Sequence, residues 1–157
     1  MRTIIICLVC SLKDNVMHWQ QLMSKGNNYF ETQQWGKAES YYKTVFSQLE
    51  GQWEVGKDNE SLLMAWICAC HNLASLFEAK GEYERSIGYL VRAYQQAYYI
   101  SQNSFMESSL RYLAFNALKT TLDPIIIFST KYPTCENCIE QLKRLEQTLD
   151  AKMKTIH

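Results

Sequence analysis

Helix-breaking residues are scarce in this sequence, which has only two prolines and six glycines among 157 residues. Proline and glycine are the residues least compatible with a helix interior. Their scarcity, in a chain that is 47% hydrophobic and 20% charged, excludes a disordered protein and indicates a compact, helix-rich one. The length is that of a single domain with a substantial core.

An excess of either charge is also missing, because sixteen acidic residues balance sixteen basic ones. A neutral chain has no overall field that attracts nucleic acid or an anionic membrane. The sequence contains neither a glycine-rich phosphate loop nor a dense basic patch with interleaved aromatic residues. We therefore expect neither nucleic acid nor a membrane as a partner.

The apolar run Ile4–Val9 is too short to span a bilayer, which requires roughly 20 apolar residues. It resembles the start of a secretory signal, but it is at the lower limit of length and no small-x-small cleavage site follows it. The helical pattern opens directly at Met17. We expect residues 1–16 to be either an extension without a packed role or a short docked segment, and residues 17–157 to form one helical domain.

The three histidines, His18, His71 and His157, do not cluster in the sequence. None has a serine, cysteine or aspartate partner of the kind that forms a catalytic triad. His71 follows Cys70 directly, but adjacent helical residues point about 100° apart, so the two side chains cannot meet. We expect no enzymatic activity and no cofactor.

The six cysteines occur as three close pairs. They are Cys7 and Cys10, Cys68 and Cys70, and Cys135 and Cys138. Cys68 and Cys70 fall in a helical pattern and point to different faces, so they cannot bridge each other without distorting the helix. We expect the cysteines to be reduced, small, buried side chains of a cytoplasmic protein.

Cys135 and Cys138 allow a different role. At the start of a helix the macrodipole lowers the pKa of a thiol, which suits a redox pair. Redox CxxC motifs normally follow a strand, however, and a zinc site needs four ligands. We expect no metal site, and a redox- or metal-responsive regulator is kept as an alternative function.

Two amphipathic runs within residues 70–97 are joined by the break Lys80-Gly81-Glu82. Their apolar residues recur at spacings of three and four, which places each set on one stripe of a helix. These residues are Leu73, Ala74, Leu76 and Phe77 in the first run, and Tyr83, Ile87, Leu90, Val91 and Tyr94 in the second. Gly81 can end the first helix in the left-handed conformation. The pattern predicts an antiparallel helical hairpin.

A second hairpin is predicted upstream, within residues 17–50. Apolar stripes again lie on either side of a short break, here Gln34-Trp35-Gly36, and Gly51 ends the second stripe. Gly26 falls inside the first stripe. A residue without a side chain is expected there if another helix crosses closely at that point.

The two hairpins share a set of positions with the tetratricopeptide repeat, whose signature is Leu-Gly-x-x-Tyr followed by Ala-x-x-x-Phe. The matching residues are Gly26, Tyr29, Trp35, Ala38 and Tyr42 in the first copy, and Leu73, Ala74, Phe77, Gly81, Tyr83 and Ala93 in the second, with Ser86 at the small position between the helices. The chain therefore resembles a tetratricopeptide-repeat protein. Its two copies are offset by 48 residues instead of about 34, so Gly51–Asn59 is expected to be a loop between repeats, and Glu50 and Tyr98 replace the closing proline.

A third unit is degenerate. Leu113 and Ala114 are expected to lie on its first helix, and Asp123-Pro124 predicts the start of a further short helix that carries Ile125–Phe128. Thr134 is expected to cap a last helix, from Glu136 to about residue 154, which covers the end of the array. We expect an all-α fold of six or seven helices, and the resemblance implies antiparallel hairpins in a short right-handed superhelix with a C-terminal capping helix.

In tetratricopeptide arrays the first helices of the hairpins line a concave groove, so the resemblance implies a non-catalytic adaptor that binds a protein or peptide. The residues that it places in the groove are Met23, Asn27, Phe30, Glu31, Cys68, His71, Asn72, Ser75, Glu78, Ser108, Arg111 and Tyr112. Asn27 and Asn72 match the asparagines of the carboxylate-clamp subset, but non-basic residues stand where its cations belong. We therefore expect a groove for an extended or helical segment instead of such a clamp. Asn72 is also consistent with a purely structural amide.

Self-association is the other alternative function. A short array leaves an apolar stripe open at one end. A twofold dimer could cover that end. We expect its contacts to come from an exposed Trp53 and from the apolar segment Ile125–Phe128.

Overall fold

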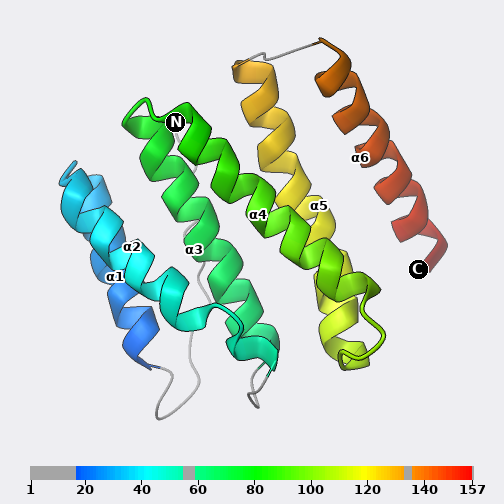
Figure 1. Ribbon diagram of the computed structural model, residues 1–157, viewed down its shortest axis with the longest axis horizontal. Helices are drawn as coiled ribbons and strands as arrows, with labels where there is room; N and C mark the ends of the chain where they lie inside the picture. The colour runs from blue at the N-terminus through cyan, green and yellow to red at the C-terminus, as the bar shows by residue number, and fades with distance from the viewer. Residues whose placement is uncertain (1–16, 55–58, 133–135, 157) are drawn as a thin grey trace. The chain divides into compact units, whose positions relative to one another are not determined.

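The computed structural model describes residues 17–54, 59–132 and 136–156, and within these ranges the chain is all-α, as expected, with no strand (Figure 1). The elements are α1 (Met17–Glu31), α2 (Trp35–Leu49), the 3-10 helix η1 (Gln52–Glu54), α3 (Asn59–Ala79), α4 (Tyr83–Gln102), α5 (Ser108–Lys131) and α6 (Glu136–Ile156). The chain divides into two compact units, Met1–Tyr89 and Leu90–His157, with the boundary inside α4. Each unit is described here by itself.

Both hairpin turns of the first unit end their leading helix in the same way. At the end of α1, Gln34 N–H donates to the Tyr29 carbonyl at 2.9 Å, and at the end of α3, Glu82 N–H donates to the Phe77 carbonyl at 2.8 Å. The residue before each donor has a positive φ, which is 77° at Gly81, as the sequence predicts. Such a six-to-one bond around a left-handed residue satisfies carbonyls at a helix C-terminus.

The crossing of α1 and α2 depends on Gly26. A Cβ at this position would lie 2.6 Å from Cε1 of Tyr42, a buried ring on α2. In the second hairpin the residue 48 positions later is Ala74, whose carbonyl accepts a hydrogen bond of 2.8 Å from the buried Ser86 hydroxyl on α4. Small residues therefore stand where the paired helices approach each other in both hairpins, as the sequence predicts for Gly26.

α3 is the central helix of the first unit. Residues 63–77 on it are buried except Met64, which is half-buried, and Ser75, which is exposed. In the described part of the chain, α3 is the helix long and apolar enough to cross a membrane, and 72% of its apolar window is buried inside the protein. A core helix passes the same length and composition test.

A continuous chain of aromatic rings packs α3 against its neighbours. Successive ring centroids are 5.2 to 5.6 Å apart along the order Trp53, Trp66, Phe46, Tyr89 and Phe77. Trp53 is only 2% exposed, so the expectation that it is exposed and available for a dimer is wrong. The 3-10 turn at Gln52–Glu54 directs its indole into the unit, which the linear sequence does not reveal.

The second unit contains the C-terminal part of α4 together with α5 and α6. α5 continues without interruption through Pro124, so the prediction that a new helix begins at Asp123 is wrong. Proline removes the bond to the carbonyl four residues earlier, and here that residue is the exposed Thr120, whose carbonyl water can satisfy. Lys119 on α5 and Asp150 on α6 form an ion pair of 2.7 Å.

Candidate functional site

Three of the predicted groove residues meet where α1 lies beside α3. Asn72 Nδ2 on α3 donates to Asn27 Oδ1 at 3.3 Å and to Met23 Sδ at 3.1 Å, both on α1. The Tyr42 hydroxyl donates to the same Asn27 oxygen at 2.8 Å. Burial, followed by the charge of Glu31, raises the pKa of Tyr42, so this hydroxyl stays protonated and remains a donor.

In this network Asn72 has a structural role. Its amide nitrogen has two hydrogens, and the two contacts to α1 engage that nitrogen. The amide therefore joins α1 to α3, which is a structural role. It bonds side chains of another helix and not a neighbouring backbone group.

The two first helices run side by side in the same direction (Figure 1). We use the name α1–α3 face for the stripe formed by Met23 and Asn27 of α1 and by Cys68, His71, Asn72 and Ser75 of α3. Each α3 member lies three or four residues from another member, so the four form one stripe along their helix. Ser75 is exposed, whereas Cys68, His71 and Asn72 are buried.

His71 is a buried, neutral histidine. It is 6% exposed, and burial lowers its pKa from 6.5 to about 4. Its Nε2 has no hydrogen-bond partner among the described residues. A neutral imidazole nitrogen can accept or donate a hydrogen bond, depending on the tautomer.

Trp19 is a site residue that the sequence did not single out. Its Nε1 is buried and, like His71 Nε2, has no hydrogen-bond partner in the part of the chain that the structure describes. It lies four residues before Met23 and so shares that side of α1. The i to i+4 spacing was visible in the sequence, but an apolar stripe does not reveal whether an indole N–H finds a partner.

The other predicted groove residues take different positions. Phe30 is half-buried and packs edge-on against Trp35 at a centroid distance of 5.3 Å, at the hairpin end of α1. Glu31 is exposed and Glu78 is half-buried. The remaining residues, Ser108, Arg111 and Tyr112, lie on α5 in the second unit.

The cysteines differ from the expected reduced set in one respect. Cys70 is buried and forms no disulfide, as expected, but Cys68 is disulfide-bonded. Cys135 and the side chain of Cys138 lie outside the described residues, as do the side chains of His18 and His157, so the structure says nothing of these predictions. Within the described ranges no group of three or more histidine, cysteine, aspartate or glutamate side chains is placed to hold a metal ion.

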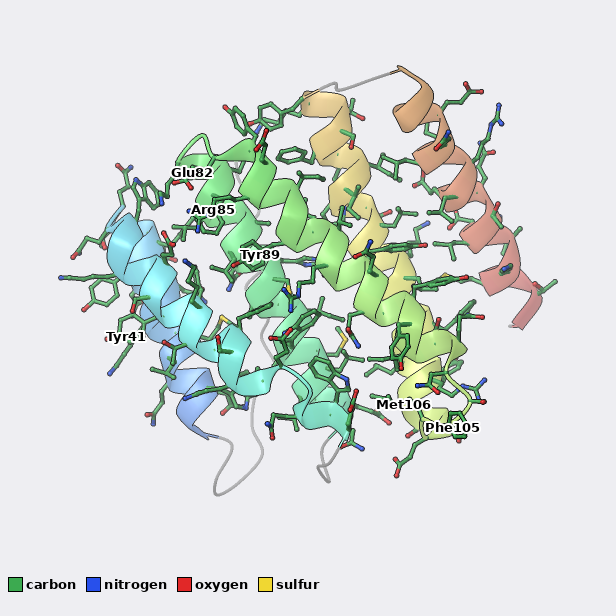
Figure 2. The ribbon with its side chains drawn as sticks, viewed as in Figure 1. Tyr41, Glu82, Arg85, Tyr89, Phe105 and Met106 are labelled. Carbon is green, nitrogen blue, oxygen red and sulfur yellow. The ribbon has the colours of Figure 1, made fainter. Side chains whose placement is uncertain are left out.

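An ion cluster at the α3–α4 turn was not predicted. Glu39 on α2 lies 2.6 Å from Lys43, 3.0 Å from Lys80 and 3.4 Å from Arg85. Glu82 pairs with Lys80 at 2.7 Å and with Arg85 at 2.6 Å, and Figure 2 shows Glu82 and Arg85 close together at this turn.

The cluster rests on an aromatic ring and is internally paired. The Arg85 guanidinium carbon lies 3.9 Å from the centroid of Phe77. Burial tends to raise the pKa of Glu39, but hydrogen bonds from Lys43 and Lys80 outweigh it and lower that pKa to about 2. Because its charges already pair with one another, the cluster stabilises the contact between α2 and the second hairpin and does not form an open binding site.

Comparison with protein families shows a match over most of the chain. A protein-family model described as "Protein of unknown function (DUF2753)" matches residues 17–157. No curated protein and no solved structure matches the chain.

Proposed function

The chain belongs to the DUF2753 family of proteins of unknown function, and we propose that it is a non-catalytic adaptor that binds an extended peptide segment along the α1–α3 face. The resemblance of the two hairpins to tetratricopeptide repeats favours this use of their first helices. The proposal concerns the first unit only.

One observation carries the proposal. Trp19 Nε1 on α1 and His71 Nε2 on α3 are buried and have no hydrogen-bond partner among the described residues. A buried polar group without a partner costs about 1–3 kcal/mol. An extended peptide offers one carbonyl and one N–H in every residue, so its backbone can accept from the indole and bond the imidazole at the same time.

The edge of the face indicates the chemistry of the segment. Glu31 and Glu78 lie towards the C-terminal ends of α1 and α3, beyond Asn27 and Ser75. Apolar side chains suit the buried part beside Met23, and a basic residue suits the acidic end. We propose a ligand with an apolar core and a flanking positive charge.

A selection of displayed peptides on the intact, reduced chain tests this proposal. Ser75→Tyr places a large side chain on the exposed edge of the α1–α3 face, and Ser40→Tyr makes the same change on the exposed side of α2. Selected peptides, measured by fluorescence anisotropy, are expected to bind the Ser75→Tyr variant at least about tenfold more weakly, and to bind the Ser40→Tyr variant as they bind the parent. Failure to enrich any peptide, or equal binding to both variants, contradicts the proposal.

Self-association is a second candidate, favoured by apolar exposure in the second unit. Phe105 is 98% exposed, and Ile127 of the predicted apolar segment is 66% exposed. The Phe105 backbone N–H donates to Asn103 Oδ1 at 3.0 Å, which fixes the turn that presents this ring. Figure 2 shows Phe105 and Met106 together in this loop.

Light scattering at several protein concentrations tests self-association. A mass that rises towards that of a dimer in the parent and stays monomeric in a Phe105→Ser/Ile127→Ser variant supports it. A monomeric parent at every concentration rules it out.

A further inference from the structure

We propose that α5 carries a self-complementary stripe through which two copies of this chain pair, with the two α5 helices antiparallel about a twofold axis near Thr120. This inference rests on the proposed self-association and names its interface. In this register Tyr112 of each copy packs on Ile127 of the other copy. Asn116 of each copy bonds Asp123 of the other.

These five residues form an exposed stripe, which we call the α5 stripe. They are separated by four, four, three and four positions along the chain, so they share one side of the helix. Tyr112 is 49% exposed and Ile127 is 66% exposed. Thr120 is exposed, and Asn116 and Asp123 are half-buried. None of the five belongs to the buried side of α5, so the stripe is open to a partner.

The α5 stripe matches itself when it is turned end over end. Tyr112 and Ile127 are centred on a point midway between residues 119 and 120, and Asn116 and Asp123 are centred on the same point. In two antiparallel helices that cross at this point, each residue faces the one at the same distance on its other side. A twofold contact requires such a self-complementary surface.

The inner pair joins an unused donor to an unused acceptor. Among the described residues, neither the Asn116 amide nor the Asp123 carboxylate has a hydrogen bond or an ion pair. Across the antiparallel seam the amide N–H of one copy donates to the carboxylate of the other, and the twofold axis repeats this bond. Hydrogen bonds to a charged acceptor are roughly twice as strong as neutral ones. In a parallel arrangement the two Asp123 carboxylates would face each other and repel.

The centre of the stripe offers a backbone acceptor. Pro124 lacks the N–H that would bond the Thr120 carbonyl within the helix. Thr120 lies next to the proposed axis, so the Thr120 hydroxyl of one copy can donate to this carbonyl of the other. The proline inside α5 therefore leaves an acceptor at the middle of the proposed interface.

The length of the stripe predicts a weak dimer. Tyr112 and Ile127 are about 22 Å apart along the helix axis, and helices that cross at about 20° remain in contact over that distance. A single helix pair buries less than the roughly 800 Å² per partner that is usual in stable complexes. We therefore expect a dimer whose population depends on protein concentration.

An exchange of charges in the full-length chain tests this register. Tyr112→Glu and Ile127→Lys are each expected to weaken dimerisation at least about tenfold, because each places a charge against an apolar side chain of the other copy. The double variant is expected to return to within about threefold of the parent, because opposite charges then meet at both ends of the seam. Tyr98→Glu, at a tyrosine on α4 that is 51% exposed, is the matched control and is expected to leave the dissociation constant unchanged. Sedimentation equilibrium between about 1 µM and 1 mM protein measures these constants.

Asp123→Asn tests the inner pair without disturbing the apolar contacts, and so covers the case in which a charge at Tyr112 unfolds the chain. It removes the charge of the acceptor in both copies and is expected to weaken dimerisation at least about threefold. An unchanged dissociation constant overturns the proposed register.

The outcomes separate this interface from self-association in general. A parent that is monomeric at every concentration overturns both. A dimer that tolerates Tyr112→Glu, or that the double variant does not restore, overturns the α5 interface and leaves self-association standing. Peptide binding by the first unit is measured separately and is not affected by either result.

Discussion

Gln33 stands in the first hairpin where Gly81 stands in the second, 48 residues later, and both have a left-handed backbone, with φ of 58° and 77°. Their turns share the same hydrogen bonds. Gln33 N–H donates to the Phe30 carbonyl at 3.0 Å, and Gly81 N–H donates to the Glu78 carbonyl at 3.0 Å. The first turn thus holds a residue with a side chain in a conformation that suits glycine.

Gln33→Gly is expected to stabilise the protein. The left-handed conformation costs a residue with a Cβ roughly 1–2 kcal/mol, whereas glycine adds roughly 0.5–1 kcal/mol of unfolded-state entropy, so a net gain of about 0.5–1 kcal/mol follows. Urea unfolding measures it as a higher midpoint with an unchanged slope. Gly81→Ala is the reciprocal control and is expected to lower the midpoint, although no atom lies within 4 Å of the added Cβ. An unchanged or lower midpoint for Gln33→Gly contradicts the strain argument.

Gly26→Ala is expected to destabilise the protein, against the usual trend for helices. Replacing glycine by alanine inside a helix normally adds about 1 kcal/mol of stability. Here the new Cβ would lie 2.6 Å and 2.7 Å from two atoms of the Tyr42 ring, and the hydrogen bond to Asn27 holds that ring in place. Overpacking of this kind costs about 1–3 kcal/mol.

Gly88→Ala is the matched control for this effect, because Gly88 lies in α4 with nothing within 4 Å of an added Cβ. It is expected to stabilise the protein by up to about 1 kcal/mol. Thermal and urea unfolding of the two variants check the opposite signs. Stabilisation by Gly26→Ala would mean that the two helices cross less closely than described.

Local sequence patterns were sufficient to predict the helices and the hairpins. Spacings of three and four located the apolar stripes, and Gly81 marked its turn because a left-handed residue favours glycine. Gln33 carried no such signal. Pro124 misled because the sequence does not show that α5 has buried residues on both sides of it.

The candidate site was predictable as far as the repeat resemblance assigned its members to the first helices of the two hairpins. The resemblance to tetratricopeptide repeats placed Met23 and Asn27 of α1 and His71 and Asn72 of α3 in one predicted groove. The ion cluster was not predictable, because Glu39 is joined to Lys80 and Arg85 more than 40 residues away, and only its contact with Lys43 has a local spacing. Such long-range pairing depends on how the hairpins pack.

Glu39→Gln is expected to lower stability by about 1 kcal/mol, since it leaves three cations without their shared carboxylate while solvent screens much of the effect. The matched control is Glu140→Gln on α6, whose ion pair with Arg144 is 62–73% exposed and is expected to change stability by less than about 0.5 kcal/mol. Urea unfolding at low salt measures both. The difference between them should shrink at 1 M salt, where the Debye length falls to about 3 Å. An equal loss in both variants would show that the cluster adds nothing to an ordinary surface pair.

The pH dependence of stability is expected to report on His71. Its folded-state pKa of about 4 is below the unfolded value of 6.5, so the unfolded chain binds more protons between these values. The contribution of neutral His71 to the free energy of unfolding is therefore fully present above about pH 6.5. It decreases as the pH falls towards 4, by roughly 3 kcal/mol in all. Glu39 contributes in a lower window, because its pKa of about 2 is below its ordinary 4.5, and its contribution is lost as the pH falls from about 4.5 to 2.

Two variants assign the upper window to His71. His71→Leu replaces the imidazole with an apolar side chain of similar size and is expected to flatten the dependence between pH 6.5 and 4.5. A His18→Gln/His157→Gln chain keeps His71 as its sole histidine and is expected to retain that dependence. Urea midpoints at several pH values distinguish these outcomes. The prediction is wrong if His71→Leu keeps the slope of the urea midpoint against pH, or if the double variant loses it. Either result would mean that another histidine titrates on unfolding. The imidazole of His71 would then not be the buried, uncharged group on which peptide recognition by this face depends.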